Sequence, residues 1–522
     1  MSYDTDNIKK PGLFTAIAIG VGCIVGSGWL FASYNAARLV GPMSFVSWIM
    51  GALLALTLAL LLAETASMFT DRGFFARILT FSHKNNDYGF LIAVANLFGL
   101  ILVIPSEASA TIQYLSHVYP LLMTGKDLSL TGELWVCLLV LLYGAINFWG
   151  MRLLSQCNNV ITLFKIIVPI STGFLLIIYA GWDGHFSLSN FTLGGFYTAT
   201  GVQETATGMM GPAVSAVVQA GIFYSFYGFA MIAIFGTELD KPQKTIPLAL
   251  ISCVFLCLGV YLLLQFAFIG AMPANLIAGG WSHIGLFTSP LAQLLGLIGV
   301  NLGVVTVLYI DSAVSPSGTG AIYMASSARM ITGMSQDGQL PSFFNKISER
   351  FNLSRRSLTA VFAISIFIVF FAKNWQNIMI IVTVFQLLAC VAIPVALVKL
   401  RKSEPDRARP FKMPGGTVLS YMIFLVLAYL TIQAHEKANV FSLIAMVGLF
   451  VIYAVSKYKG EVGKIMKAFA SSWSLFLYLA VGIVFSHLSD INAFNNAPVI
   501  VSFIVIYTIS YYSLIYQKNH NE

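Results

Sequence analysis

Three ionisable residues interrupt long apolar stretches of the sequence: Glu107, Lys165 and Asp311. A charged side chain inside a bilayer is costly, so such residues usually face a protein interior or a water-filled cavity and serve a function. Glu107 could carry a proton or pair with a cationic group, and burial would make Lys165 easier to deprotonate. A purely structural role is the alternative for Glu107 and Lys165. We therefore take these three residues as candidates for proton coupling.

Glycine lies in the middle of two apolar segments, residues 13–40 and 216–235. Glycine lowers helix stability and exposes the backbone, so the clusters at 26–28 (GSG) and 224–228 (YSFYG) predict local breaks. Broken helices at membrane depth are tolerated only where they face protein or a cavity, and transporters place their substrates where two breaks meet. Close helix packing through small residues is the alternative. The two clusters lie in the first and sixth segments, which correspond to each other if segments 1–5 and 6–10 are inverted repeats. This correspondence favours a transport site over simple packing.

The composition indicates which elements position these residues. Of 522 residues, 58% are hydrophobic and only 10% are charged, with a mean hydropathy of +0.82. A soluble protein of this length needs more charged side chains to cover its surface. Apolar runs of roughly 18 residues or more number about fourteen, with about twelve as the lower count. We therefore predict an all-α polytopic membrane protein, which excludes most soluble enzyme classes.

The chain carries 29 Lys and Arg against 21 Asp and Glu. With the N-terminus inside, nearly all loop Lys and Arg fall on the cytoplasmic side, and only Lys126, Lys373 and Lys437 fall outside. This asymmetry is typical of the positive-inside rule. It predicts a multi-pass protein of the cell membrane with both termini cytoplasmic and with no nucleic-acid partner. The first segment is too long for a signal peptide, so we expect the N-terminus to be retained.

Four regions follow along the chain. Residues 1–11 form a cytoplasmic N-terminal tail, 12–400 a transport core, 401–416 a basic cytoplasmic connector, and 417–522 additional C-terminal transmembrane helices. The six cysteines lie in or beside apolar segments, where free cysteine packs as a small hydrophobe. No metal-ligand spacing, phosphate-binding loop or nucleophile motif is present, so we expect no metal, no cofactor and no enzyme activity.

Four motifs, in the right order, resemble signatures of the amino acid-polyamine-organocation (APC) transporters. Residues 22–31 (GCIVGSGWLF) resemble G-x-x-[IV]-G-[ST]-G-[IV]-F, and 236–247 (GTELDKPQKTIP) resemble E-x-x-x-P-x-[KR]-x-[IL]-P. Residues 64–74 are similar to E-L-[AS]-x-x-x-P-x-x-G-G, with Thr70 at the proline and Phe74 at the second glycine. Residues 327–344 resemble the S-x-R and D-G-x-L-P-x-x-F loop. The matches cover residues 12 to about 400. About fourteen rather than twelve apolar segments, together with Pro105-Ser106-Glu107, make the chain look most like the bacterial aspartate:proton symporter-like branch.

The resemblance implies a five-plus-five inverted-repeat fold, with segments 1 and 6 broken, and a substrate site at the two breaks. A buried zwitterion needs partners for both charges. Backbone N–H groups at 26–28 would face the carboxylate, and carbonyls at 23–24 and 225–227 the ammonium. Aromatic residues at 226, 227 and 229 would form a gate, with core packing as the alternative. The predicted substrate-binding residues are Cys23, Ile24, Gly26, Ser27, Gly28, Glu107, Tyr224, Ser225, Phe226, Tyr227, Gly228 and Phe229.

The resemblance also implies roles for the buried charges. Lys165 is similar to the fifth-segment lysine that, in sodium-independent members, replaces a sodium ion and bridges helices 1 and 8. Asp311 falls in the eighth segment, which lines the coupling-ion site of this fold. Protons are therefore expected rather than sodium. Arginine/agmatine exchangers carry an acidic residue where this chain has Ala230, which argues against their mechanism.

We expect a proton-coupled importer of amino acids, with acidic amino acids as the favoured substrates. An exchanger of an amino acid for its amine, or a non-transporting sensor on the same fold, is the alternative. Expected partners are a small-molecule amino acid or amine, protons and the lipid bilayer, and the chain is expected to be a monomer or a homodimer.

Overall fold

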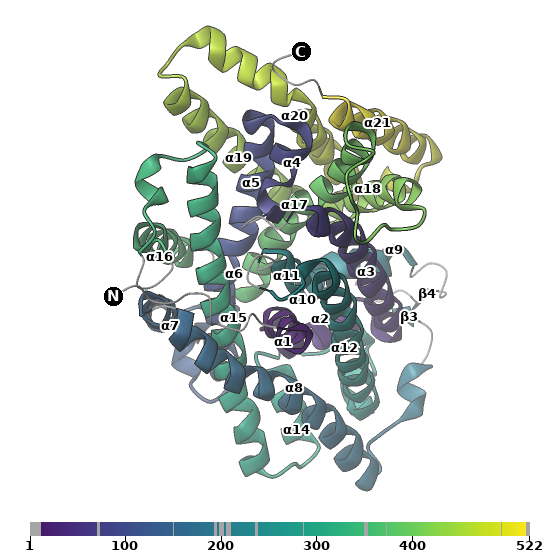
Figure 1. Cartoon of the computed structure of the whole chain (residues 1–522). Coiled ribbons are helices and arrows are strands. Elements are labelled where there is room, and N and C mark those ends of the chain that lie inside the picture. Colours follow the sequence, from purple (N-terminus) through teal and green to yellow (C-terminus); the bar gives the residue numbers. More distant parts are fainter. Residues whose placement is uncertain are drawn as a thin grey trace.

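The structure is a computed structural model of the chain, and it describes residues 12–69, 74–149, 151–192, 196–197, 203–204, 210–234, 239–285, 287–348, 353–371, 373–491 and 493–517. The predicted tail 1–11, the chain end 518–522 and the motif residues 70–73 and 236–238 lie outside these ranges. The described residues are almost entirely helical (Figure 1). The predicted all-α class is therefore confirmed.

The first half of the core begins with a helix in two pieces and continues as long apolar helices. Its helices are α1 (Leu13–Ile24), α2 (Gly28–Val40), α3 (Ser44–Met68), α4 (Phe74–His83), α5 (Asn86–Ile101), α6 (Val103–Leu115), α7 (Leu130–Phe148) and α8 (Met151–Trp182), with 3₁₀ turns η2 (Gly41–Met43), η3 (Pro120–Leu122) and η4 (Leu188–Phe191).

The second half also begins with a helix in pieces. Its helices are α9 (Met210–Gln219), α10 (Ile222–Phe226), α11 (Ala230–Ile234), α12 (Pro242–Ala271), α13 (Ala274–Ile277), α14 (Pro290–Leu297), α15 (Leu302–Gln336), α16 (Arg355–Val369) and α17 (Trp375–Ser403), with 3₁₀ turns η5 (Tyr227–Phe229), η7 (Trp281–His283) and η8 (Ser342–Asn345). Two short antiparallel pairs lie in loops, β1 (Met123–Thr124) with β2 (Asp127–Leu128) and β3 (Phe196–Tyr197) with β4 (Gln203–Glu204).

Four further helices follow the core: α18 (Gly416–Ile432), α19 (Glu436–Lys457), α20 (Val462–Asp490) and α21 (Ala497–Ile515), with η9 (Ala493–Asn495) between the last two. In Figure 1 they lie along one edge of the bundle, whereas α1, α2, α10 and α11 lie at its centre. Among the described residues, 9 helices are long and apolar enough to cross a membrane, or up to 10 with the bent pair at α9 and α10. The larger count stays a prediction.

Polar capping residues mark where two of these helices begin. Asn85 before α5 and Asn374 before α17 each accept hydrogen bonds from N–H groups of the first helical turn, which satisfies donors that the helix leaves free. Where the sequence predicts a connector at 401–416, α17 extends to Ser403 and α18 begins at Gly416.

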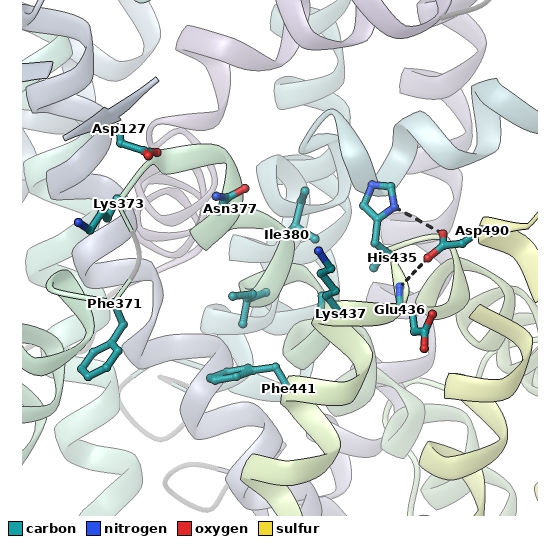
Figure 2. Close-up of a pocket in the computed structure, with 13 residues that line it drawn as sticks. Asp127, Phe371, Lys373, Asn377, Ile380, His435, Glu436, Lys437, Phe441 and Asp490 are labelled. Carbon is teal, nitrogen blue, oxygen red and sulfur yellow. Dashed lines mark hydrogen bonds and ion pairs between the residues drawn. The ribbon is translucent and has the colours of Figure 1, made fainter. Parts of the chain in front are cut away.

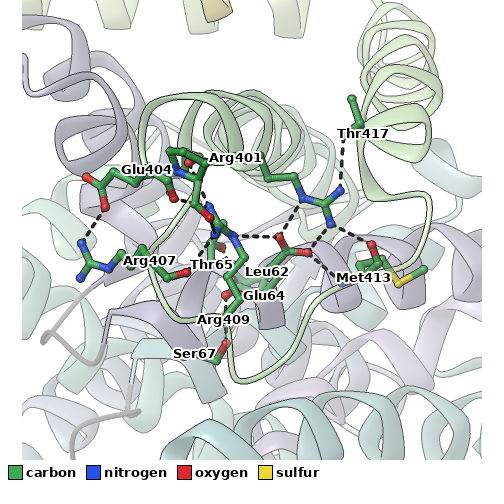
Figure 3. A network of polar contacts seen from close by, with 12 residues as sticks. Leu62, Glu64, Thr65, Ser67, Arg401, Glu404, Arg407, Arg409, Met413 and Thr417 are labelled. Atoms are coloured by element: carbon green, nitrogen blue, oxygen red, sulfur yellow. Dashed lines mark hydrogen bonds and ion pairs between the residues drawn. The ribbon is translucent and has the colours of Figure 1, made fainter.

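Glu64, near the end of α3, joins the core to that connector (Figure 3). Its carboxylate is almost fully buried and accepts from Arg401 Nε at 2.8 Å and Nη2 at 2.6 Å. The Met413 backbone N–H donates to the same carboxylate at 2.8 Å, and Arg409 Nε lies 3.7 Å away. A buried charge needs such partners to offset its lost hydration. Glu64 thus ties the loop before α18 to α3.

Candidate functional site

The first span is broken where its glycines predict. Helix α1 ends at Ile24 and α2 begins at Gly28, with Val25, Gly26 and Ser27 between them. Val25 leaves helical geometry at ψ 86°, and the Gly26 N–H donates to the Ile24 carbonyl only two residues back, at 3.0 Å. The backbone groups of a helix end and a helix start are therefore brought together inside the bundle.

The break in the sixth span differs from the prediction. The chain bends by 55° between α9 and α10, at Gly221, whose φ of +82° is left-handed. Helix α10 then runs through Phe226 and tightens into the 3₁₀ turn η5. The sharp bend thus precedes the predicted cluster 224–228, because Gly221 and not Gly228 takes the conformation that other residues rarely adopt.

Gly228 instead allows the two broken spans to touch. A Cβ atom added to Gly228 would lie 2.4 Å from the Cys23 carbonyl carbon and from Ile24 N, and one added to Gly28 would lie 2.2 Å from Ser225 Oγ. The Tyr261 hydroxyl, on α12, lies 2.9 Å from the Ser225 carbonyl and 3.3 Å from the Ile24 carbonyl. Two of the carbonyls predicted to receive an ammonium group thus share a protein donor in this conformation.

Glu107, on α6, reaches the start of α2. Its Oε2 accepts from the Ser27 backbone N–H at 2.7 Å, and its Oε1 accepts from Ser27 Oγ at 3.0 Å and from the Tyr224 hydroxyl at 2.6 Å. All three residues are almost fully buried. A Cβ on Gly26 would lie 2.7 Å from Oε1 and 2.8 Å from Oε2. A carboxylate therefore sits against the positive end of a helix, which favours negative charge.

Trp375 covers this cluster. Its Nε1 donates to Ser27 Oγ at 2.9 Å, and its ring stacks on Phe31 at 4.6 Å. Both aromatic residues also line a cavity of about 390 Å³ that opens at the end of α2, together with Arg38, Lys126 and Asp127. The Trp375–Phe31 pair thus separates the cavity from the Glu107 carboxylate. Nothing in the sequence around Trp375 distinguishes it from a tryptophan at a membrane interface.

Phe226, Tyr227 and Phe229, which the sequence predicts to close over the substrate as a gate, do not line this cavity. All three are fully buried. Phe226 packs edge-on against Trp48 and Tyr261 at 6.0 and 5.3 Å, and the Tyr227 hydroxyl donates to Asn96 Oδ1 at 3.2 Å. They pack in the core here, which is the alternative weighed for them, because α10 turns its Tyr224 side chain toward Glu107.

Lys165, on α8, tethers the broken first span to α15. Its Nζ donates to the Gly22 carbonyl and to Thr319 Oγ1, and Thr319 Oγ1 lies within 3.4 Å of the Val25 carbonyl. Lys165 is fully buried. The ammonium thus binds at the free carbonyls where α1 ends, which favour positive charge. This contact of Lys165 with the first span (α1) and the eighth span (α15) is the one that the family resemblance implies.

Asp311 is separate from the Glu107 cluster. It is fully buried on α15, and neither carboxylate oxygen has a hydrogen-bond partner among the described residues. One turn on, Ser315 Oγ is also buried without a partner in the described part of the chain. Pro316 leaves the Ser312 carbonyl free, and Thr111 Oγ1, one turn from Glu107, donates to it at 2.9 Å. Asp311, on α15, and Glu107, on α6, therefore lie on two helices that pack against each other.

A second cavity of about 790 Å³ adjoins the first and lies between α17 and α19 (Figure 2). Both cavities are lined by Asp127 and Asn377. Its far wall carries His435, 3.6 Å from Asp490, and Glu436, whose N–H donates to Asp490 at 3.1 Å. Residues around the start of α19 and the end of α20 thus form one wall of this second cavity.

Two broken helices that meet at a buried polar cluster, within a bundle of apolar spans, define a secondary transporter rather than an enzyme. Comparison with known proteins agrees. The amino acid permease family model matches residues 12–452, and the chain belongs to this family of the APC superfamily.

The chain is similar to two transporters of Bacillus subtilis (strain 168) along almost its whole length. It is 33% identical over 488 residues to the glutamate/serine transporter AimA, covering 91% of this chain and 87% of the relative. It is 29% identical over 510 residues to an aspartate-proton symporter, covering 96% and 94%. A methylthioribose transporter of the same organism is 25% identical over 421 residues, covering 77% of this chain and 83% of the relative. The protein is thus a multi-pass membrane transporter of amino acids.

Proposed function

We propose that the protein imports amino acids across the cell membrane with protons, and that acidic amino acids are among its substrates. The observation that carries the proposal is the cluster at the two breaks, where Ser27, Glu107 and Tyr224 meet behind Trp375. A helix start and a helix end provide opposite partial charges for a zwitterion. Glu107, Lys165 and Asp311 are the proposed proton-coupling residues.

Acidic substrates are supported by two independent features. Arg38 and Lys126 line the cavity above Trp375 against one acidic residue, Asp127, and a net positive approach attracts anions. The names of two relatives also include glutamate and aspartate. Proton coupling is supported by Lys165, whose ammonium holds Gly22 and Thr319, because a fixed protein cation there takes the place that a sodium ion would need.

We place both termini in the cytoplasm. The Glu64–Arg401 and Arg77–Asp337 ion pairs then lie on the cytoplasmic side, and the cavity above Trp375 opens outward. The proposed resting conformation is therefore closed inside and partly open outside. A monomer or a homodimer fits the proposal equally.

Uptake into proteoliposomes tests the function. Labelled L-glutamate, L-aspartate and L-serine are offered with the lumen alkaline, and competition by the other common amino acids ranks the substrates. Accumulation that collapses when the pH gradient is dissipated, and that is insensitive to sodium, supports proton symport. Uptake that requires an internal amine would instead identify the exchanger, and binding without flux would identify a sensor. Sodium-driven uptake would overturn the assignment of Lys165.

A further inference from the structure

Glu107 occupies the position in which the substrate's own carboxylate is expected. The carboxylate of an amino acid and that of a glutamate side chain are the same chemical group. Of the donors predicted at 26–28, the Gly26 N–H donates to the Ile24 carbonyl at 3.0 Å, and the Ser27 backbone N–H and Ser27 Oγ both donate to Glu107, at 2.7 and 3.0 Å. The anion site at the first break is therefore filled by the protein itself.

The fit around Glu107 is close. A Cβ on Gly26 would lie 2.7 and 2.8 Å from the two carboxylate oxygens, so only glycine leaves room for a carboxylate against this backbone. The Tyr224 hydroxyl is a third donor to the carboxylate, at 2.6 Å. Ser27 Oγ in turn accepts a hydrogen bond from Trp375 Nε1 at 2.9 Å. Ser27, directly before α2, and Tyr224, on α10, thus bind the Glu107 carboxylate, and Trp375, on α17, binds Ser27.

Two carboxylates cannot share these donors. Each oxygen of Glu107 is already engaged, and two like charges a few ångströms apart repel strongly in a dry interior. We propose that Glu107 is an internal substitute for the substrate carboxylate, which closes the empty site and which an incoming amino acid must displace. This inference rests on the proposed function and adds that Glu107 opposes substrate binding in the resting state, rather than pairing with the substrate ammonium.

The sign of one substitution separates these two roles. Glu107→Gln keeps the shape of the side chain and removes its charge, and a neutral acceptor forms a hydrogen bond about half as strong as a charged one. If Glu107 competes with the substrate, Glu107→Gln lowers the dissociation constant by about tenfold, the effect of roughly one charge-assisted hydrogen bond. If Glu107 binds the substrate ammonium, the same change raises the dissociation constant.

Binding of labelled L-glutamate, L-aspartate and L-serine is measured on the purified full chain in lipid nanodiscs. Glu133→Gln is the matched control, because Glu133 is another buried glutamate, placed in the first turn of α7 away from the breaks. We expect tighter binding for Glu107→Gln and unchanged binding for Glu133→Gln. Tyr224→Phe removes the hydroxyl that holds Oε1, and we expect it to tighten binding by about threefold, as the loss of a single hydrogen bond allows.

Weaker or unchanged binding in both site variants overturns the inference while leaving the proposed function intact, provided that the wild type takes up the probe. If Glu107→Gln does not fold, the Tyr224→Phe result decides the question alone. If the wild type neither binds nor takes up any of the three probes, the proposed function fails, and the inference fails with it.

Discussion

The contact at Gly228 gives the sharpest test of how the two broken spans are held together. In Gly228→Ala the new Cβ would lie 2.4 Å from Cys23 C and Ile24 N, and 2.5 Å from Cys23 O. These are backbone atoms, which cannot rotate away as the end of a side chain can. Ordinary contact begins at 3.4 Å, so the two spans must separate by about 1 Å, and overpacking of this kind costs about 1–3 kcal/mol.

Gly259→Ala is the matched control, because Gly259 has no atom within 4 Å of its Cβ position and lies in the long helix α12. We expect Gly228→Ala to lower the thermal stability of the detergent-purified protein and to abolish amino acid uptake into proteoliposomes. Gly259→Ala should leave uptake intact and slightly raise stability through helix propensity. Full uptake by Gly228→Ala would refute the close contact between the breaks.

Three further predictions follow from other contacts. Lys165→Gln removes the ammonium that joins Gly22 to Thr319, and we expect uptake driven by a pH gradient to fall by at least about tenfold, while exchange of labelled for unlabelled substrate persists. Loss of both activities would indicate a structural role. Glu64→Gln breaks the buried pair with Arg401 and should cost about 3 kcal/mol in thermal melts, whereas Glu461→Gln, in the exposed pair with Lys464, should be neutral. Burial and the nearby Lys399 lower the pKa of His83, in the connecting helix α4, to about 3. Because only the unfolded chain then binds a proton below about pH 6.5, stability should drop by about 2 kcal/mol between pH 7 and 5, and a flat melting temperature would contradict this.

Much of the architecture follows from the sequence because the bilayer imposes it. Apolar length, glycine clusters and loop charge are local properties, and a helix is the structure that satisfies every backbone group within its own segment. The break at Gly26 was predictable for this reason. The contact of Lys165 with the first and eighth spans was predictable only from the family resemblance.

The details of the site depend on contacts between distant segments. Glycine frequency cannot tell the bend at Gly221 from the close approach at Gly228, because the two uses differ only in φ and in what packs opposite. The aromatic cover likewise comes from Trp375 and Phe31, 344 positions apart in a chain whose aromatic residues are common. The partner of Glu107 was also not predictable, since a hydrogen bond to Ser27 spans 80 residues.

The substrate is proposed to bind where the two broken spans meet. A structure of the full chain in lipid nanodiscs with saturating L-glutamate shows whether it does. We predict that the ligand carboxylate lies within hydrogen-bonding distance of the Ser27 N–H, with Glu107 displaced from that donor. Ligand bound elsewhere, such as in the cavity between α17 and α19, with Glu107 still on Ser27, would contradict the claim.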